Sequence, residues 1–351
     1  MPPASPLVLA HRGASGSLPE HTLAAYALAA RQGADYLELD LVATRDGTLV
    51  ARHENDTRGT TDVARHPGLA GRRRRALVDG TTVDGVFTED LDLGELRTLR
   101  ARERLPRLRG TDRDGEWPVP TFPEIIALRA ELSEELGREL GLYVELKHPT
   151  HFAAAGLPLE ERMLADLEAA GLAGPEAPVW VQCFEPGSLR RLREELGCRL
   201  RQVLLATAPQ DVPADLVAAG DPRTYAELLS PEGLAGLVGY VDGLGPRKQM
   251  VLPWSPDGTL GEPTPLVADA HAAGLVVHAW TFRAENEFLP PALRRDPAGR
   301  SGDADGGAPP PPATHGDLAA EVRQHLEAGV DGIFTDHPDL VVQALRAADG
   351  G

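Results

Sequence analysis

Short apolar runs alternate with segments of helical spacing along almost the whole chain. Several helical segments begin near Pro, Asp or Thr and stop at Gly, which are common helix start and stop signals. The apolar runs predict strands at Leu7–Ala10, Tyr36–Leu41, Leu49–Arg52, Leu142–Leu146, Val179–Phe184, Leu200–Leu205, Val238–Leu244, Leu275–Phe282 and Gly332–Thr335. The segments between them predict helices at Glu20–Gln32, Phe122–Leu140, Pro158–Ala170, Pro186–Leu196, Pro213–Ala219, Thr264–Ala273 and Gly316–Ala328. Repeated strand–helix units predict an α/β fold of parallel strands, and about eight units fit a closed barrel better than an open sheet.

Two stretches interrupt this alternation. Residues 54–118 are rich in charge, Gly and Arg, and we interpret them as an insertion after the strand that ends at His53. Residues 290–316 are rich in Pro, Gly and Asp, a composition typical of segments that do not pack, and they predict a flexible loop before the last expected helix. Two interpretations of this loop stay open: a lid over the catalytic face, or plain disorder. The whole chain, 1–351, is interpreted as a single domain.

Composition and charge narrow the class of partner. The chain has 351 residues, of which 42% are hydrophobic and 25% charged, as in ordinary globular proteins with a large core. No run approaches the roughly 20 apolar residues that span a bilayer, so no stable membrane insertion is expected. The net charge of -18 argues against nucleic acid as a partner. A small anionic substrate stays compatible with it, because a local Arg, Lys or metal ion can dominate the field in a cleft. Oligomeric state is left open.

The first residues and the cysteines bear on the compartment. The N-terminus lacks a basic region, and its first apolar run, Leu7–Ala10, is too short for a signal peptide. We therefore expect a cytoplasmic protein, or a secreted or periplasmic one if a leader has been trimmed. Cys183 and Cys198 could pair, but a core of this size does not need the bond, so reduced thiols are favoured.

Acidic side chains share one face of two expected strands. Because side chains alternate across a strand, Glu38 and Asp40 lie on the face opposite the leucines of Tyr36–Leu41. Glu145 and Lys147 repeat this pattern in a later strand. Salt bridges to Arg or Lys are one interpretation of these acids. The other is a site for a divalent cation, for which three carboxylates suit Ca²⁺ or Mg²⁺.

Two histidines, His11 and His53, each end an expected strand near these acids. Histidine accepts and donates protons near neutral pH, so the pair suits general acid and base catalysis, although structural roles are the alternative. Arg12 supplies a planar fork that matches phosphate oxygens. It could equally be a buried partner for Glu38 or Asp40.

Weaker candidates lie on later strands. His278 and Trp280 share a face, and Trp280 could line a substrate pocket or fill the core. Gln182 and Phe184 are expected to line the mouth of the barrel. Three histidines without a supporting motif are expected at the surface: His21, His148 and His151.

Several of these motifs occur together in one known family. In order, they are HRG (11–13), PEHT (19–22), GADYLELDLVATRDG (33–47), RHEND (52–56), PTFPEI (120–125), VELK (144–147), VQCFEPGSL (181–189), HAWTFR (278–283) and GVDGIFTDHPDL (329–340). With these motifs the chain resembles the glycerophosphodiester phosphodiesterases, and in particular a bacterial subgroup that includes periplasmic, calcium-dependent enzymes. One departure is Glu54, which stands where Asp commonly follows the second histidine.

The resemblance implies a (β/α)₈ TIM barrel that hydrolyses glycerophosphodiesters to sn-glycerol 3-phosphate and an alcohol, using a divalent metal. The glycerol 2-hydroxyl would attack first, through a cyclic phosphate. The family's roles fall on these residues: metal ligands Glu38, Asp40 and Glu145; catalytic His11 and His53; phosphate-binding Arg12 and Lys147; and a pocket aromatic, Trp280. Two alternatives stay open, an enzyme acting on lipid head groups (lysophospholipase D or phospholipase C-like) and a non-catalytic phosphodiester-binding protein.

Overall fold

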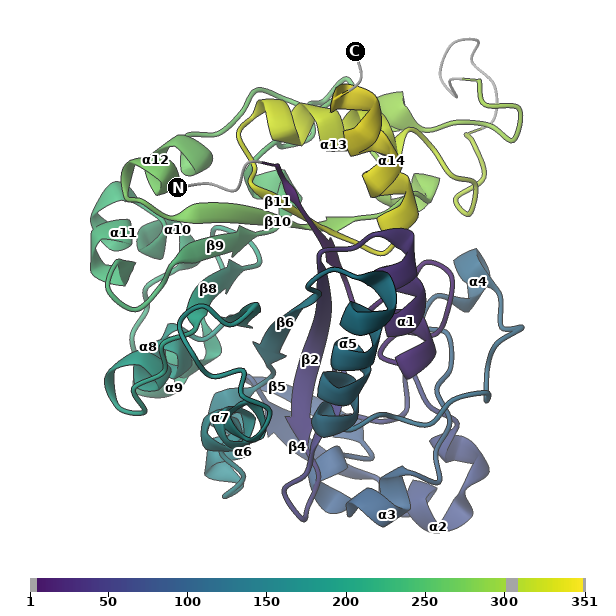
Figure 1. Ribbon diagram of the computed structural model, residues 1–351, viewed down its shortest axis with the longest axis vertical. Helices are drawn as coiled ribbons and strands as arrows, with labels where there is room; N and C mark the ends of the chain where they lie inside the picture. Colours follow the sequence, from purple (N-terminus) through teal and green to yellow (C-terminus); the bar gives the residue numbers. More distant parts are fainter. Residues whose placement is uncertain (1–4, 301–308, 350–351) are drawn as a thin grey trace.

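The computed structural model of the protein describes residues 5–300 and 309–349, and its main feature is a closed barrel of parallel strands (Figure 1). The barrel strands are β1 (Leu7–Ala10), β2 (Tyr36–Ala43), β6 (Gly141–Leu146), β7 (Val179–Cys183), β8 (Arg201–Ala206), β9 (Gly243–Pro246), β10 (Val276–Phe282) and β11 (Gly332–Thr335). They pair in chain order, and β1 closes the ring by pairing with both β2 and β11. This arrangement confirms the predicted (β/α)₈ barrel.

Helices follow the barrel strands and cover the outside of the ring (Figure 1). They are α1 (Leu23–Gln32), α5 (Phe122–Leu136), α6 (Pro149–Ala154), α7 (Leu159–Ala169), α8 (Pro186–Glu194), α9 (Ala214–Ala219), α10 (Tyr225–Leu228), α11 (Pro231–Leu237), α12 (Leu266–Ala272), α13 (Leu318–Glu327) and α14 (Pro338–Asp349), with a 3-10 turn η3 (Lys248–Met250). Local signals set their ends. The Thr22 side chain accepts from the Ala25 amide at the start of α1, and Gly33, at φ 101°, ends it in the left-handed conformation that favours glycine.

Several elements differ from the expectation. The predicted strand Leu49–Arg52 is β3 (Leu49–Ala51), which pairs antiparallel with β2 beside the ring and is not a barrel strand. The predicted strand Val238–Leu244 begins only at Gly243, because α11 runs to Leu237 and Val238 is 49% exposed. Helices α6, α10, α11 and α14 were not among the predicted helices; α14 begins with Pro338, and Pro is favoured at the first helical position.

The insertion at 54–118 folds as a group of short elements between β3 and α5. These are η1 (Val63–Arg65), α2 (Pro67–Ala70), β4 (Arg74–Val78), β5 (Thr81–Gly85), η2 (Thr88–Asp90), α3 (Leu93–Leu96) and α4 (Pro106–Arg109). In Figure 1 the arrow of β2 points toward the blue part of the chain that holds α2, α3 and β4. The insertion therefore lies at the carboxyl end of the barrel, where barrel enzymes carry their active sites.

The segment 290–316 is tied to the barrel over the part that the structure describes. It follows η4 (Asn286–Phe288) and contains η5 (Pro291–Leu293). The Asn286 amide donates to the carbonyls of Arg295 (2.8 Å) and Pro311 (2.9 Å), so one side chain holds both described stretches. This packing was not expected from the composition. Residues 301–308 lie outside the described residues, and the flexibility of the loop stays a prediction.

The barrel has an outer and an inner layer of side chains. Leu37, Leu39 and Leu41 of β2 face the helices, as alternation predicts, and belong to the main apolar core. The interior is filled by Leu9, Tyr143, Trp180, Val203, Leu205 and Phe334. His278 lies fully buried among them, and the Tyr143 hydroxyl bonds its Nδ1 at 2.8 Å. Both cysteines are free thiols. Within the described chain, every helix is too short or too polar to cross a membrane.

Candidate active site

A cavity of about 960 Å³ opens at the carboxyl ends of the strands. Side chains from all eight barrel strands or the loops that follow them reach it, and insertion residues Asp79 and Thr81 add to its wall. Its lining includes most of the predicted site residues: His11, Arg12, Glu38, His53, Glu145, Lys147, Gln182, Phe184 and Trp280. The predicted residues therefore converge in space although the sequence spreads them from His11 to Trp280.

Three buried carboxylates meet beside this cavity, and two of them, Glu38 and Glu145, line it. Asp40 on β2 and Glu145 on β6 are direct register partners, and Glu38 lies one side-chain repeat before Asp40. One oxygen from each of Glu38, Asp40 and Glu145 lies within 4.8 Å of the others. Lys147 Nζ stands 2.6 Å from Glu145 Oε1 and 3.3 Å from Asp40 Oδ1. The salt-bridge interpretation is therefore correct for Lys147, and the carboxylate cluster that a metal would need is present as well.

The charges in this cluster do not balance. Burial raises the pKa of Glu38 well above its usual range, and the charges of Asp40 and Glu145 add to the rise. Burial also raises the pKa of Glu145 to about 8, although Lys147 opposes it. For Asp40 burial is outweighed by Lys147 and His21, which hold its pKa well below the usual range. Three acids with too little positive charge, and oxygen ligands only, are the donor set of a hard divalent cation.

His21 is a correction to the sequence analysis, which placed it at the surface. It is buried, and its Nε2 lies 2.8 Å from Asp40 Oδ2. Because the ionised Asp40 can only accept, His21 Nε2–H donates to it. The other ring nitrogen then accepts from the Tyr26 hydroxyl at 2.7 Å. His148 and His151 are also not free at the surface, since they bond Asp79 and Glu89 of the insertion.

Each of the two predicted catalytic histidines is held by a carboxylate. His11 Nδ1 lies 2.6 Å from Asp336 Oδ1, and His53 Nδ1 lies 2.6 Å from Glu54 Oε1. Ionised carboxylates only accept, so both Nδ1 atoms carry hydrogen and both Nε2 atoms keep a free electron pair. Burial, followed by the charge of Arg12, lowers the pKa of His11 to about 4. Burial with Arg12 and Lys147 also lowers the pKa of His53. Both rings are therefore ready to accept a proton at neutral pH.

Arg12 is a buried partner of acidic residues and also lines the cavity. Its guanidinium Nη1 bonds Glu20 at 3.2 Å, and its Nε lies 3.5 Å from Asp40 Oδ2. Its backbone amide donates to Glu38 Oε2 at 2.7 Å. The residue has φ 59°, which is unusual for a side chain other than glycine, and such strain is held only where the surroundings fix it. These contacts place a fixed cation at the edge of the cavity.

Aromatic side chains form the outer wall. Phe184 and Trp280 pack edge to face with ring centroids 5.8 Å apart. Trp280 Nε1 donates to the Gly245 carbonyl at 2.7 Å, and the Lys147 ammonium lies 5.4 Å from the Phe184 ring. On the floor, Gln182 Nε2 donates to Glu38 Oε1 at 3.0 Å. The pocket thus joins a charged floor to an aromatic part of its wall.

Four further residues complete the site and were not predicted. Asp336 and Glu20 bond the predicted residues His11 and Arg12. Arg104 and Arg109 of the insertion bond these acids in turn. Asp336 stands directly after β11, so its strand-end position was a signal that could have found it. The two arginines lie in irregular sequence, where neither periodicity nor a motif marks them.

This geometry defines a class. A closed barrel whose strand ends gather acids, histidines and basic side chains around one cavity is a barrel enzyme with a site for an anionic substrate. The model of the glycerophosphoryl diester phosphodiesterase family matches residues 11–340, and the chain belongs to this family. It is an enzyme that hydrolyses phosphoric diesters, which removes the non-catalytic binding protein from the alternatives.

Relatives agree over most of the chain. A glycerophosphodiester phosphodiesterase of Arabidopsis thaliana is 34% identical over 83% of this chain and 78% of its own length. One from Haemophilus influenzae is 28% identical over 97% of this chain and 90% of its own. Among solved structures, an Oleispira antarctica phosphodiesterase in complex with the product sn-glycerol-3-phosphate superposes with a TM-score of 0.59 at 19% identity, covering 97% of both chains. At that identity the likeness concerns the fold.

Proposed function

We propose that this phosphodiesterase cleaves glycerophosphodiesters to sn-glycerol 3-phosphate and an alcohol, with a divalent cation held by Glu38, Asp40 and Glu145. The observation that carries the proposal is the meeting of three buried carboxylates and two carboxylate-held histidines in one cavity. The product named for the Oleispira antarctica relative supports the glycerol 3-phosphate half of the substrate.

The three carboxylates suit Ca²⁺ or Mg²⁺, which both prefer oxygen ligands. A cation bound there would stabilise the negative charge that develops on the phosphoryl and attacking oxygens. Arg12 and Lys147 would neutralise the phosphate, since both are cations at the cavity. Gln182 would hold Glu38 in place, and Phe184 and Trp280 would contact the alcohol part of the substrate.

The two histidines would move the protons. One takes the proton of the glycerol 2-hydroxyl as its oxygen bonds to phosphorus, and the other protonates the alcohol oxygen as its bond to phosphorus breaks. The cyclic phosphate is then opened by water, with the two histidines exchanging roles. Asp336 and Glu54 bind Nδ1 in both rings, so each histidine works through Nε2. The base enters the first step with Nε2 unprotonated, and the acid enters it as an imidazolium that carries the donated proton on Nε2. Which histidine acts as acid in the first step is decided by the experiment on leaving groups described below.

The test is release of sn-glycerol 3-phosphate from glycerophosphocholine by chelator-treated protein, alone and with Ca²⁺ or Mg²⁺. We expect release to return with at least one of the two ions. In the same assay His11→Ala and His53→Ala should each lower kcat by at least about 10²-fold with folding intact. His271→Ala is the matched control, because His271 pairs with Asp331 outside the cavity at 2.8 Å. Metal-independent release, or near-normal turnover in either variant, would contradict the proposal.

A second candidate is hydrolysis of lipid head groups. Two apolar side chains that line the cavity, Val217 and Trp254, are 55% and 39% exposed, as a surface meeting an acyl chain would be. Micellar lysophosphatidylcholine in the same assay distinguishes the two substrates. Choline release from the lysolipid with no product from glycerophosphocholine would favour this second function.

A further inference from the structure

One short loop of the insertion contacts the carboxylates behind both proposed catalytic histidines. This loop, residues 102–110, is called the arginine loop and includes α4. Three of its arginines form ion pairs, and two of these reach out of the insertion to acids on the barrel side. Arg104 also pairs with Glu54 at the start of the insertion. Together with Arg109 it therefore binds both carboxylates that hold the histidines, Glu54 and Asp336.

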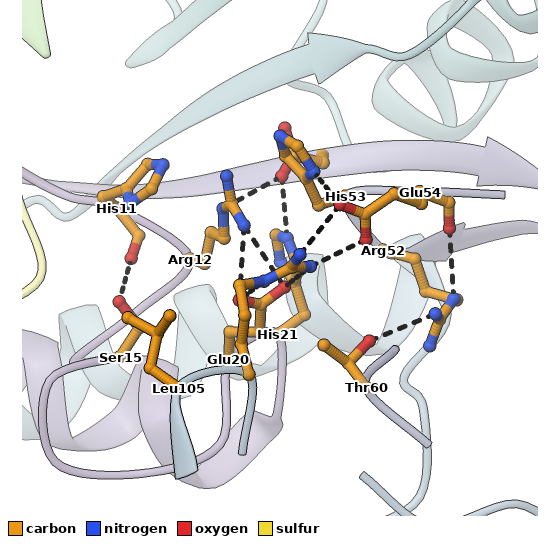
Figure 2. Close-up of polar contacts among 12 residues, drawn as sticks. His11, Arg12, Ser15, Glu20, His21, Arg52, His53, Glu54, Thr60 and Leu105 are labelled. Carbon is orange, nitrogen blue, oxygen red and sulfur yellow. Dashed lines mark hydrogen bonds and ion pairs between the residues drawn. The ribbon is translucent and has the colours of Figure 1, made fainter. Parts of the chain in front are cut away.

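Arg104 links the acids behind His53 and Arg12. Its guanidinium donates from Nε and Nη2 to Glu20 at 2.6 and 2.7 Å. It donates from Nη1 and Nη2 to Glu54 at 2.8 and 2.7 Å. Figure 2 shows Arg12, Glu20, His53 and Glu54 around one shared group of dashed contacts, whereas the contact drawn for His11 goes to Ser15. One bidentate cation therefore fixes the carboxylate that bonds His53 Nδ1.

Arg109 occupies the equivalent place behind His11. Its Nη2 donates to Asp336 Oδ2 at 2.7 Å, while Asp336 Oδ1 bonds His11 Nδ1. Its Nε donates to Glu285 at 2.6 Å and its Nη1 to the Ser15 carbonyl at 2.8 Å. The side chain is only 7% exposed. Arg109 thus joins the insertion to the loops that follow β1, β10 and β11.

We propose that Arg104 and Arg109 are positioning residues, through which the insertion holds Glu54 and Asp336 so that His53 and His11 present Nε2 to the substrate. The inference rests on the roles proposed above for the two histidines. A carboxylate that bonds a histidine Nδ1–H fixes both tautomer and ring orientation, and its own orientation depends on its other partners. If the two arginines served only the stability of the fold, their pairing with the two acids that bond the histidines would not be expected. Arg102 of the same loop pairs inside the insertion, with Asp114 at 3.1 Å.

Neither arginine is the sole partner of its acid. Arg283 Nε also bonds Asp336 Oδ2 at 2.7 Å, so Asp336 keeps one cation when Arg109 is replaced. The effect of Arg109→Met should therefore be smaller than that of Asp336→Asn. Arg104 holds two acids by four contacts, and its replacement should disturb Arg12 as well as His53.

The experiment compares Arg104→Met and Arg109→Met with the control Arg102→Met. We expect kcat to fall about 10- to 100-fold in the first two with KM changed far less, because misplacing a catalytic group costs turnover more than binding. The control should stay within about twofold of the parent enzyme. Circular dichroism checks that each variant folds. If Arg109→Met does not fold, Arg109→Lys, which keeps a buried cation, takes its place. Its kcat should stay below that of the parent enzyme, because Lys lacks the planar fork of Arg.

Two readouts separate positioning from a general structural effect. In the Asp336→Asn background, Arg109→Met should lower kcat by less than about twofold more, because the two residues act through one chain of contacts. The second readout replaces choline by p-nitrophenol in the substrate. A good leaving group needs no proton donor. The variant whose arginine lies behind the histidine that acts as general acid should therefore regain most of its lost rate with this substrate. The variant that recovers thus identifies the acid.

Each result points to one conclusion. The positioning role would be overturned if Arg104→Met and Arg109→Met fold and have the same kcat as Arg102→Met. The proposed function would still stand in that case, provided that His11→Ala and His53→Ala are inactive. Fully additive losses of Arg109→Met and Asp336→Asn would overturn it too. Active His11→Ala and His53→Ala enzymes would instead defeat the proposed function first.

Discussion

Single carboxylates decide what each neighbouring histidine can do in this site. Asp336 and Glu54 leave Nε2 of His11 and His53 free for proton transfer. Asp40 does the opposite to His21, because it takes the Nε2–H while the Tyr26 hydroxyl takes up Nδ1. With both nitrogens engaged, His21 serves to hold a carboxylate of the acidic cluster.

His21→Ala therefore tests how far this second layer supports cation binding. Without the Nε2–H bond, Asp40 loses one of its fixed partners, and we expect the affinity for Ca²⁺ or Mg²⁺ to fall about 10- to 100-fold. Isothermal titration calorimetry on chelator-treated protein measures it directly, without reference to turnover. His271→Ala, whose partner Asp331 lies outside the cavity, should bind the ion as the parent does. Unchanged affinity in His21→Ala would show that Asp40 needs no such support.

At the scale of elements, buried and exposed ion pairs hold helices in different ways. Lys248, in η3 after β9, contacts Glu321 of α13 at 2.7 Å, and both side chains are buried. Arg31 of α1 contacts Glu135 of α5 at 2.8 Å, but these side chains are 53% and 48% exposed. The distances are alike, so the difference in solvent access decides what each pair contributes.

Glu321→Gln and Glu135→Gln form a matched pair of variants. Glu321→Gln leaves the Lys248 ammonium buried without its charged partner, and we expect the free energy of unfolding to fall by about 3 to 5 kcal/mol. Glu135→Gln should change it by less than about 1 kcal/mol, because water screens the exposed pair. Urea unfolding followed by circular dichroism measures both. Equal losses would mean that burial does not govern these contacts.

At the scale of the whole molecule, folding buries two histidines in their neutral form. His278 lies inside the barrel and His325 lies between α13 and the barrel, and both are fully buried. Burial lowers the pKa of each to about 4. In the unfolded chain the value is about 6.5, so the unfolded state binds protons first as the pH falls.

Stability should therefore decline on mild acidification. The contribution of each histidine is fully present above about pH 6.5 and is lost as the pH falls toward 4, by up to about 3 kcal/mol. Urea unfolding of the parent and of His325→Gln at pH 7.5, 6 and 5 isolates one histidine. We expect the difference in unfolding free energy between the two proteins to shift in favour of the variant as the pH falls. A difference independent of pH would contradict neutral burial of His325.

Most of the fold and the first layer of the site could be predicted because they depend on short-range pattern. Alternation on β2 placed Glu38 and Asp40 opposite the leucines, and the structure has them so. Strand β3 was misplaced because an antiparallel extension and a parallel barrel strand have the same local composition. His21 was misplaced because nothing near it in sequence reveals that Asp40 would lie beside its ring.

The sequence by itself determined the strand–helix alternation, the inward faces of the strands and hence the meeting of acids and histidines at one end of a barrel, since these follow from a period of two and from parallel topology. Only the tertiary structure decided which carboxylate holds which histidine, and that an insertion supplies Arg104 and Arg109 to hold those carboxylates. Asp336 lies 325 positions from His11, and Arg109 lies 227 positions from Asp336. Such pairings are chosen by charge and distance after the chain has folded, and no local pattern in the sequence records them.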